Sequence, residues 1–328
     1  MAVLQPEAVM ARYLERGVRP DGRDLSACRP LSIQCVPRAG AQAGHAAVRV
    51  QNGGSSALAA LTPLVTAPLP LTPNAGGVGT CWLRHTGGQA PCLCALSSPA
   101  HVPLAPPPLL RRPTEIAVHA GPLVHRSLPS GRSSALGLSL SHQLTEMFQR
   151  SGAVDLAGLC IVRDAAVWML KIDVLIESQD GALLDVAAAA VASVLAYAQL
   201  PAVLAAPGER VCLAGPGSPD TEHRVAARPI PLQSIPVCLS SVVVQGKWLA
   251  DPSAEEDALA SGHASMAVAA PLAAAQRSSQ GADMEIAYIW QAGEVAWDDA
   301  ACAAHFAVLS RHVADVLAVL VPLRTSIA

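Results

Sequence analysis

Apolar residues recur along the chain with two different periods, which predicts a protein of mixed α and β structure. Alternation of apolar and polar residues predicts strands at residues 31–36, 46–51, 56–61, 167–177, 237–244, 263–270 and 284–290. Apolar residues three or four positions apart predict helices at residues 6–16, 134–150, 183–198 and 298–321. Asn52, Gly53 and Gly54 separate two of the strands, and such a sequence favours a tight hairpin.

The order of these elements predicts two related units. We expect an N-terminal helix in residues 1–18 and a first domain at 19–200. A proline-marked linker at 201–235 leads to a second domain at 236–328, which ends in a helix. Within the first domain, residues 68–133 are rich in Pro, Gly and Ser and predict a long loop region, with short strands near 92–96 and 115–118.

Composition narrows the class of protein. Of 328 residues, 52% are hydrophobic and 14% are charged, which excludes a disordered chain. Residues 1–150 hold 13 Arg and 6 acidic residues, a net +7, whereas residues 151–328 hold 9 basic and 19 acidic residues, a net −10. The total of −3 argues against coating nucleic acid by charge alone. The uneven halves fit packing against neighbours, steering of a polyanion over one face, or plain solvated surface.

Two apolar runs and the number of cysteines indicate in which cellular environment the protein is expected. Residues 186–206 and 302–323 are long enough to cross a membrane, but internal polar residues favour buried helices. We expect no membrane contact. The start of the chain does not resemble a secretory signal, and nine Cys, an odd number, favour reduced thiols inside a cell.

Three groups of residues are candidates for chemistry. A zinc site built from Cys81, His85, Cys92 and Cys94 has unusual spacing, so we expect neither a metal nor a cofactor. The acidic cluster around residues 251–257 fits a cation site or, more readily, a helix cap. Two interpretations stay open for four arginines of the long loop. They contact the phosphate backbone of a nucleic acid, or they only keep an exposed loop soluble. These residues are Arg111, Arg112, Arg126 and Arg132.

Short motifs spread over most of the chain resemble the RNase PH family. Arg19-Pro-Asp-Gly-Arg-Asp resembles the opening turn of that family, and Gln179-Asp-Gly-Ala-Leu-Leu-Asp resembles its Asp-Gly-Asn-x-x-Asp turn into a helix. Asp251-Pro-Ser-Ala-Glu-Glu is similar to a motif of the second domain. The resemblance is greatest to non-catalytic ring subunits of the eukaryotic RNA exosome. It implies an α+β, RNase PH-like fold (ribosomal protein S5 domain 2-like), made of two related units with mixed sheets.

The resemblance also implies a function. Active members use an Asp-Gly-Gly-Thr-Arg turn, whose Thr and Arg help hold the attacking phosphate, whereas this chain has Ala182, Leu183 and Leu184 there. It therefore implies a chain without catalytic residues that supports 3′–5′ RNA processing and degradation. The implied partners are other RNase PH-like ring subunits, RNA-binding cap subunits and RNA, in the nucleus, nucleolus and cytoplasm.

The same resemblance implies structural roles for the motif residues. They are Arg19, Asp21, Gly22, Arg23, Asp180, Gly181, Asp185, Asp251, Glu255 and Glu256. Two other functions stay open: an active phosphate-dependent 3′–5′ exoribonuclease of the same family, and a binding protein unrelated to RNA.

Overall fold

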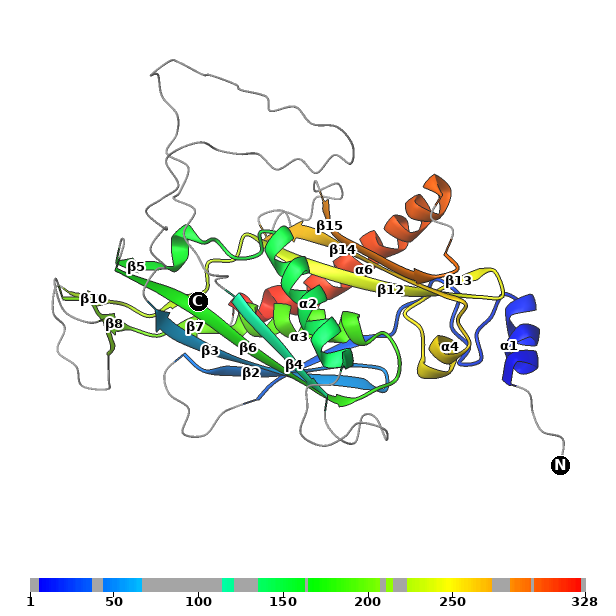
Figure 1. The fold of residues 1–328 in the computed structure, drawn as a ribbon, viewed down its shortest axis with the longest axis horizontal. Coiled ribbons are helices and arrows are strands. Elements are labelled where there is room, and N and C mark those ends of the chain that lie inside the picture. The colour runs from blue at the N-terminus through cyan, green and yellow to red at the C-terminus, as the bar shows by residue number, and fades with distance from the viewer. Residues whose placement is uncertain are drawn as a thin grey trace, which may run out of the picture.

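Two β-sheets with helices between them form the body of the molecule (Figure 1). The computed structural model describes residues 6–36, 44–66, 114–120, 135–162, 165–206, 211–214, 223–272, 284–295 and 298–325. One continuous apolar core contains residues from both sheets and from the helices between them. The two units predicted from the sequence thus bury their apolar faces against a shared interior.

The first sheet has six strands in the order β1-β2-β3-β6-β4, with β5 paired to β6. Their bounds are β1 (Leu31–Cys35), β2 (Ala46–Asn52), β3 (Ser55–Thr66), β4 (Thr114–Ala120), β5 (Cys160–Val162) and β6 (Ala166–Ser178). The predicted hairpin is confirmed, because Asn52 pairs with Ser55 across the two-glycine turn. Strand β4 runs parallel to β6 and makes the sheet mixed, while the other pairings are antiparallel.

The second sheet is antiparallel and has the order β13-β12-β14-β15. Its strands are β12 (Ser234–Val244), β13 (Lys247–Ala250), β14 (Gly262–Pro271) and β15 (Glu285–Gly293). Mixed pairing, expected for both sheets, therefore occurs in the first one, where a parallel strand enters by a longer connection.

Short strands lie in the segment between the two sheets. They are β7 (Gln199–Leu200), β8 (Val203–Leu204), β9 (Cys212–Leu213), β10 (Arg224–Val225) and β11 (Arg228–Pro229). Strands β8, β9 and β10 form one small sheet, and β7 pairs with β11. Much of the segment expected to be an irregular linker is thus paired.

The helices pack against the sheets and against one another. Helix α3 (Leu183–Tyr197) contacts strands of both sheets and most of its residues are buried, which explains its largely apolar sequence. Helix α2 (Ala135–Arg150) packs against β4 and β15. Two shorter helices, α1 (Pro6–Glu15) and α4 (Ala254–Ala258), lie together at one end of the molecule (Figure 1).

The last helix, α6 (Asp299–Thr325), packs along α3 and the second sheet. By length and composition alone α6 could also span a membrane, a property that buried helices of soluble proteins share. Its Leu309, Val313, Val316 and Leu320 are buried in the core, at the three- and four-residue spacing of one helical face. This packing agrees with the expectation of a docked helix.

Candidate functional site

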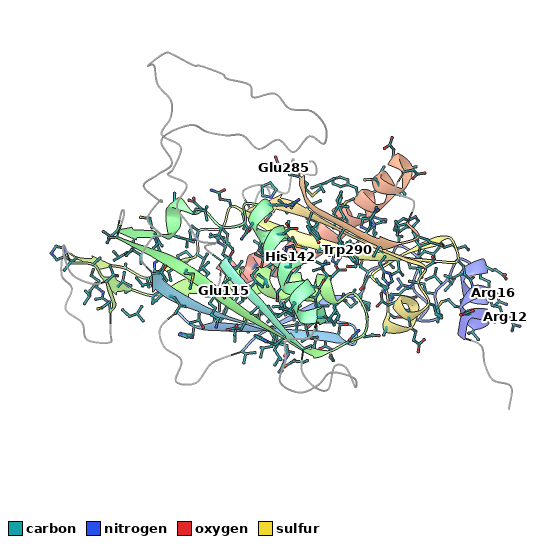
Figure 2. All side chains as sticks on the ribbon, viewed as in Figure 1. Arg12, Arg16, Glu115, His142, Glu285 and Trp290 are labelled. Carbon is teal, nitrogen blue, oxygen red and sulfur yellow. The ribbon has the colours of Figure 1, made fainter. Side chains whose placement is uncertain are left out.

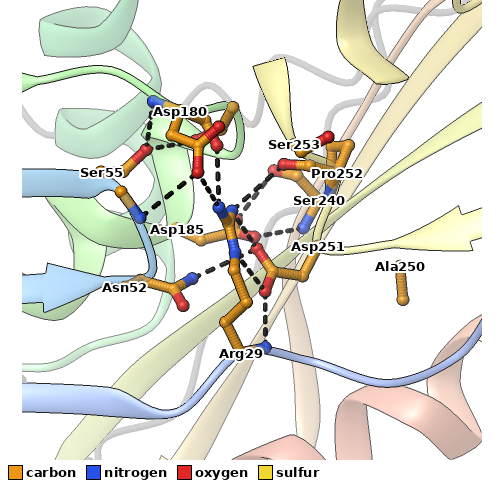
Figure 3. A network of polar contacts seen from close by, with 12 residues as sticks. Arg29, Asn52, Ser55, Asp180, Asp185, Ser240, Ala250, Asp251, Pro252 and Ser253 are labelled. Atoms are coloured by element: carbon orange, nitrogen blue, oxygen red, sulfur yellow. Dashed lines mark hydrogen bonds and ion pairs between the residues drawn. The ribbon is translucent and has the colours of Figure 1, made fainter. Parts of the chain in front are cut away.

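The motif turns that are far apart in the sequence meet at one end of the two sheets (Figure 3). The loop before β1, the β2–β3 hairpin, the turn from β6 into α3 and the turn from β13 into α4 are linked there by hydrogen bonds and ion pairs. The side chains that form these links come from both units, so the network joins the first sheet to the second.

Arg19 is the most deeply buried charge of this network, with an exposed fraction of 0%. Its Nε donates to Oε1 of the buried Glu256 at 2.7 Å, and its Nη2 forms an ion pair with Oε2 of the same carboxylate. Its guanidinium also donates to the backbone oxygens of Ala250 (2.6 Å) and Asp251 (2.9 Å). This planar, bidentate geometry satisfies both charges away from water.

Glu256 also belongs to a capping box at the start of α4. The Ser253 hydroxyl accepts a hydrogen bond from the Glu256 amide at 3.4 Å, and the Glu256 carboxylate accepts one from the Ser253 amide at 2.8 Å. The cap expected from the sequence is therefore present. Glu255 points outward and is exposed, so the acidic run divides into one buried and one exposed glutamate.

Asp251 is a second centre of the network. The Arg29 guanidinium donates to both of its carboxylate oxygens, at 3.0 and 2.7 Å, and Asn52 donates at 3.2 Å. Arg23 lies 3.3 Å from the same carboxylate and also pairs with the exposed Asp21 at 2.6 Å. Burial by itself raises the pKa of Asp251, but the hydrogen bonds and charge of Arg29 outweigh it and hold that pKa below its usual value.

Asp180 and Gly181 connect this centre to the first sheet. Arg29 also donates to the Asp180 carboxylate at 3.0 Å, and the Ser55 hydroxyl accepts from the Asp180 amide at 2.7 Å. Gly181 has a φ of +73°, and an added Cβ would lie 2.2 Å from the backbone oxygen of Pro252. No side chain fits between these two turns, which explains the glycine of the motif.

Asp185, in the first turn of α3, reaches into the second sheet. Its carboxylate accepts hydrogen bonds from the Ser240 amide (2.7 Å) and the Ser240 hydroxyl (2.8 Å), and that hydroxyl lies 2.9 Å from the Ser265 hydroxyl. Burial raises the pKa of the Asp185 carboxyl to about 6, despite these hydrogen bonds. The carboxylate is thus a polar tie between α3 and β12.

A cavity of about 120 Å³ lies on the other side of the α3 turn. Ala182, Leu183 and Leu184 contribute to its lining, together with residues of α2, α4 and the second sheet. Ala182 is held at a φ of +47° at the N-terminus of α3, a conformation that favours Gly or Asn. Below, this cavity is called the α3 pocket.

The polar lining of the α3 pocket holds little positive charge. It contains Gln143, Ser240, Ser241, Asp257, His263 and Ser265, and none of its described lining residues is Lys or Arg. Asp257 and His263 form a pair at 3.0 Å. The pocket therefore offers hydrogen-bonding groups and an aromatic wall, but no guanidinium or ammonium for a phosphate.

The structure brings together most, but not all, of the residues singled out from the sequence. Arg19, Arg23, Asp180, Asp251 and Glu256 share one network. Gly22, with a φ of +83°, only shapes the turn beside it. Arg111, Arg112, Arg126, Arg132 and the cysteine and histidine candidates for zinc lie outside the described residues, among which no cluster suited to a metal occurs.

Several contacts of this network were not expected from the sequence. Asn52 and Ser55 stand at the ends of β2 and β3, Ser240 lies within β12 and Arg29 precedes β1, and no local pattern marks the contacts that they make. Arg29 follows the opening motif and precedes Pro30, but its two carboxylate partners lie 151 and 222 residues away in the sequence. Asn52 was marked in the sequence only as part of the hairpin turn, and its burial and its hydrogen bond to Asp251 were not.

The two sheets, the helix between them and the linked motif turns define an α+β protein of RNase PH-like architecture. Two solved structures share this fold over nearly the whole chain. One is an Archaeoglobus fulgidus exosome with RNA bound to the active site (TM-score 0.60, 18% identity, 98% of each chain). The other is an archaeal exosome core (TM-score 0.61, 19% identity, 95% of this chain and 96% of that one).

Sequence comparison finds relatives of the same kind, while no protein-family model matches. Exosome complex component RRP45 of Danio rerio is 32% identical over 164 residues, which is 48% of this chain and 39% of that protein. Exosome complex component rrp43 of Schizosaccharomyces pombe is 26% identical over 259 residues, 78% of this chain and 77% of that one. The chain is thus similar in sequence to exosome complex components and shares its RNase PH-like fold with solved exosome cores.

Proposed function

We propose that this chain is a non-catalytic subunit of an exosome core ring. In this proposal it supplies part of the ring and of its RNA channel, and other subunits cleave the RNA. The observation that carries the proposal is the lining of the α3 pocket, where Leu183 and Leu184 stand at the turn that holds phosphate in active relatives.

The charge balance of the α3 pocket supports the absence of phosphorolysis. An attacking phosphate must leave water, and its negative charge then needs a partner of opposite sign. Leu184 is buried and aliphatic, and the nearest acidic side chain of the lining, Asp257, would repel the anion. His263 is the one basic group among the described lining residues, and it already pairs with Asp257.

Exposed apolar side chains support assembly with other subunits. Strand β15 is an edge strand of the second sheet, and its Ile286, Ile289 and Trp290 are 46%, 49% and 37% exposed. Figure 2 labels Trp290 beside α2 on this side of the molecule. Leu138 of α2 is also exposed. Lasting subunit interfaces are more apolar than ordinary surface, so this region fits contact with a neighbour.

The proposal is tested by producing the full chain alone and together with RNase PH-like exosome subunits. We expect the tagged chain to co-purify in a ring-sized complex. We also expect the isolated chain to release no nucleoside diphosphate from RNA in the presence of inorganic phosphate. A monomer that ignores these subunits, or robust phosphate-dependent release by the chain alone, would contradict the proposal.

The alternative is an active phosphate-dependent 3′–5′ exoribonuclease with a divergent site. The Asp257–His263 pair and the Ser240 and Ser265 hydroxyls are the observation in its favour, because they place polar groups in the α3 pocket. Under this alternative, nucleoside diphosphate release by the isolated chain would be lost on Asp257→Asn. The exposed control Glu255→Gln would leave that release unchanged.

A further inference from the structure

A groove lies between the segment that precedes β1 and one face of α6. Residues 26–31 form one of its walls. The other wall has the three- and four-residue spacing of a single helical face and consists of Val308, Arg311, His312, Asp315, Val316 and Val319. The volume of the groove is about 500 Å³, which is within the range of roughly 300–1,000 Å³ typical of small-molecule sites. Below, it is called the α6 groove.

A much smaller cavity adjoins the α6 groove on its inner side. The two share Leu31, His312 and Val316 in their linings. The smaller cavity has a volume of about 10 Å³, roughly the space of one water molecule. Asn52 and Asp185 line it, and neither of them lines the α6 groove. A ligand in the groove could therefore place one water-sized group beside these two side chains. Below, this space is called the inner cavity.

Asn52 brings a buried acceptor without a partner to the inner cavity. The residue is 5% exposed, and its Oδ1 has no hydrogen-bond partner among the described residues. Its Nδ2 donates to the Asp251 carboxylate at 3.2 Å, which fixes the orientation of the amide (Figure 3). Asp251 does not line the inner cavity, so the oxygen is the amide atom left for a group there. Buried acceptors are normally paired, and the inner cavity thus calls for a hydrogen-bond donor.

Asp185 adds a buried carboxylate without an ion pair to the same cavity. Its hydrogen-bond donors are the neutral groups of Ser240 and Cys238. The Arg29 guanidinium forms its ion pairs with other carboxylates. Burial raises the pKa of Asp185 to about 6, so its side chain is still charged above neutral pH. A donor that carries a positive charge would satisfy both Asn52 and Asp185.

The dimensions of the site select the kind of cation. A primary ammonium is a compact group with three donors, whereas a guanidinium is a wider planar fork, and a space for one water suits the former. Among the described residues there is no cluster suited to a metal ion. The α6 groove continues outward from this space with side chains that suit a methylene chain, namely Ala27, Pro30, Leu31, Val308, Val316 and Val319.

The positive groups around the α6 groove leave room for a cation. Burial lowers the pKa of His312, so its imidazole is neutral at neutral pH and does not repel an ammonium. Arg29 is neutralised by its ion pairs with Asp180 and Asp251. Arg311 is exposed, so water and salt screen its charge. An anion in the inner cavity would instead meet the Asp185 carboxylate and the Asn52 oxygen.

We propose that the α6 groove binds a linear aliphatic amine. The ammonium enters the inner cavity and donates to Oδ1 of Asn52 and to the Asp185 carboxylate, and the methylene chain lies along the valines of α6. Asp315 is exposed and lines the groove, so it pairs with a second ammonium where the ligand has one. Asn52 ends β2 and Asp185 binds Ser240 of β12, so the bound amine would stabilise the junction of the two units.

The test is isothermal titration of the full chain at about pH 8, where Asp185 is charged. The probes are butylamine, the diamine putrescine, n-butanol and butyrate. We expect saturable binding of both amines and none of butanol or butyrate. Asp185→Asn should weaken butylamine binding about 10-fold or more, the usual weight of a charged hydrogen bond. Asp315→Asn should weaken putrescine binding about 2-fold and leave butylamine binding unchanged.

A pair of matched tryptophan variants tests the position of the site. Val319 lines the α6 groove alone, and Val319→Trp should fill it and abolish amine binding. Ala318→Trp places the same side chain on the exposed neighbour, which lines neither space, and should leave amine affinity unchanged. Thermal melts without amine should match among these variants and the parent chain. Because Val319 and Asp185 lie in different parts of the site, loss of folding in one variant leaves the other as the test.

Four results would overturn the amine site. Failure of both amines to bind would show that the inner cavity holds water alone. Equal binding of butanol and butylamine, binding of butyrate in place of the amines, or amine binding that Asp185→Asn and Val319→Trp both leave intact would also contradict it. These titrations require neither a ring nor RNA, so their outcome is independent of the function proposed above.

Discussion

At the scale of single residues, the network shows how burial sets the behaviour of a charge. Asp185 and Asp251 lie in the same region, yet their pKa values move in opposite directions. Asp251 has Arg29 against both carboxylate oxygens, whereas Asp185 has the neutral groups of Ser240 and Cys238. A paired carboxylate stabilises the fold when charged, and an unpaired buried one destabilises it.

Asp185 therefore predicts an unusual dependence of stability on pH. Its pKa is raised from 3.8 to about 6 in the folded chain, so between about pH 4 and pH 6 the folded state keeps a proton that the unfolded state has lost. The free energy of unfolding should fall as pH rises through this window, by an amount of order 3 kcal/mol, and be constant above it.

Asp185→Asn removes this titration and keeps an acceptor for the Ser240 amide. Urea unfolding at several pH values should show a flatter profile for the variant between about pH 4 and pH 6. Below that window both proteins should lose stability together, because the lowered pKa of Asp251 places its loss of charge at lower pH. Equal slopes in the two proteins would contradict the assignment to Asp185.

At the scale of elements, two turns hold the units together. The turn after β13 presents the backbone oxygens of Ala250 and Asp251 to Arg19, and the first turn of α4 presents Glu256 to the same guanidinium. Helix α4 has five residues and is too short to be stable by itself, so its capping box and this ion pair fix its position.

The Arg19–Glu256 pair predicts strong coupling between the N-terminal turn and α4. Glu256→Gln leaves a buried guanidinium without a counter-charge and should lower the free energy of unfolding by about 3–5 kcal/mol. The double variant Arg19→Met with Glu256→Gln should lose less than the sum of the two single losses, because no charge is then buried alone.

The neighbouring Glu255→Gln is the control, since Glu255 is exposed and should change stability by no more than about 0.5 kcal/mol. Urea unfolding of the four variants measures all of these differences. The pair is not coupled if the stability losses of Arg19→Met and Glu256→Gln simply add in the double variant. Equal losses of stability in Glu255→Gln and Glu256→Gln would show the same.

Local sequence patterns predicted a helix, turn or cap well where the residues that form it lie within a few positions of one another. The glycine hairpin after Asn52 and the α2 stripe are read from short spacings, and the acidic run at residues 251–257 indicated a helix cap. The parallel pairing of β4 with β6 could not be read this way, because it depends on a crossover from a segment more than 40 residues away along the chain.

The candidate site was harder to predict than the fold for the same reason. The aliphatic turn at residues 182–184 was visible in the sequence, but the residues opposite it were not. Gln143 reads as one polar position on an amphipathic helix, and Trp290 as one aromatic residue on a strand. Only the packing of α2 against both β15 and α3 places these residues around one pocket.

At the scale of the whole molecule, the chain has an RNase PH-like fold, and the α3 pocket lies where its two units meet. The shared core, the α3 turn and the buried arginine ties position that pocket at the junction of the two units. Leu183 and Leu184 line that pocket, and none of its described lining residues is Lys or Arg, which is the basis of the proposed non-catalytic role.

The central claim is tested most directly by measuring whether inorganic phosphate binds the purified full chain, using ³¹P nuclear magnetic resonance over a titration into the millimolar range. The account predicts no saturable change in the phosphate signal, because the described lining of the α3 pocket has no Lys or Arg to replace the hydration of the anion. Saturable phosphate binding that Asp257→Asn or Leu184→Ala alters would contradict it.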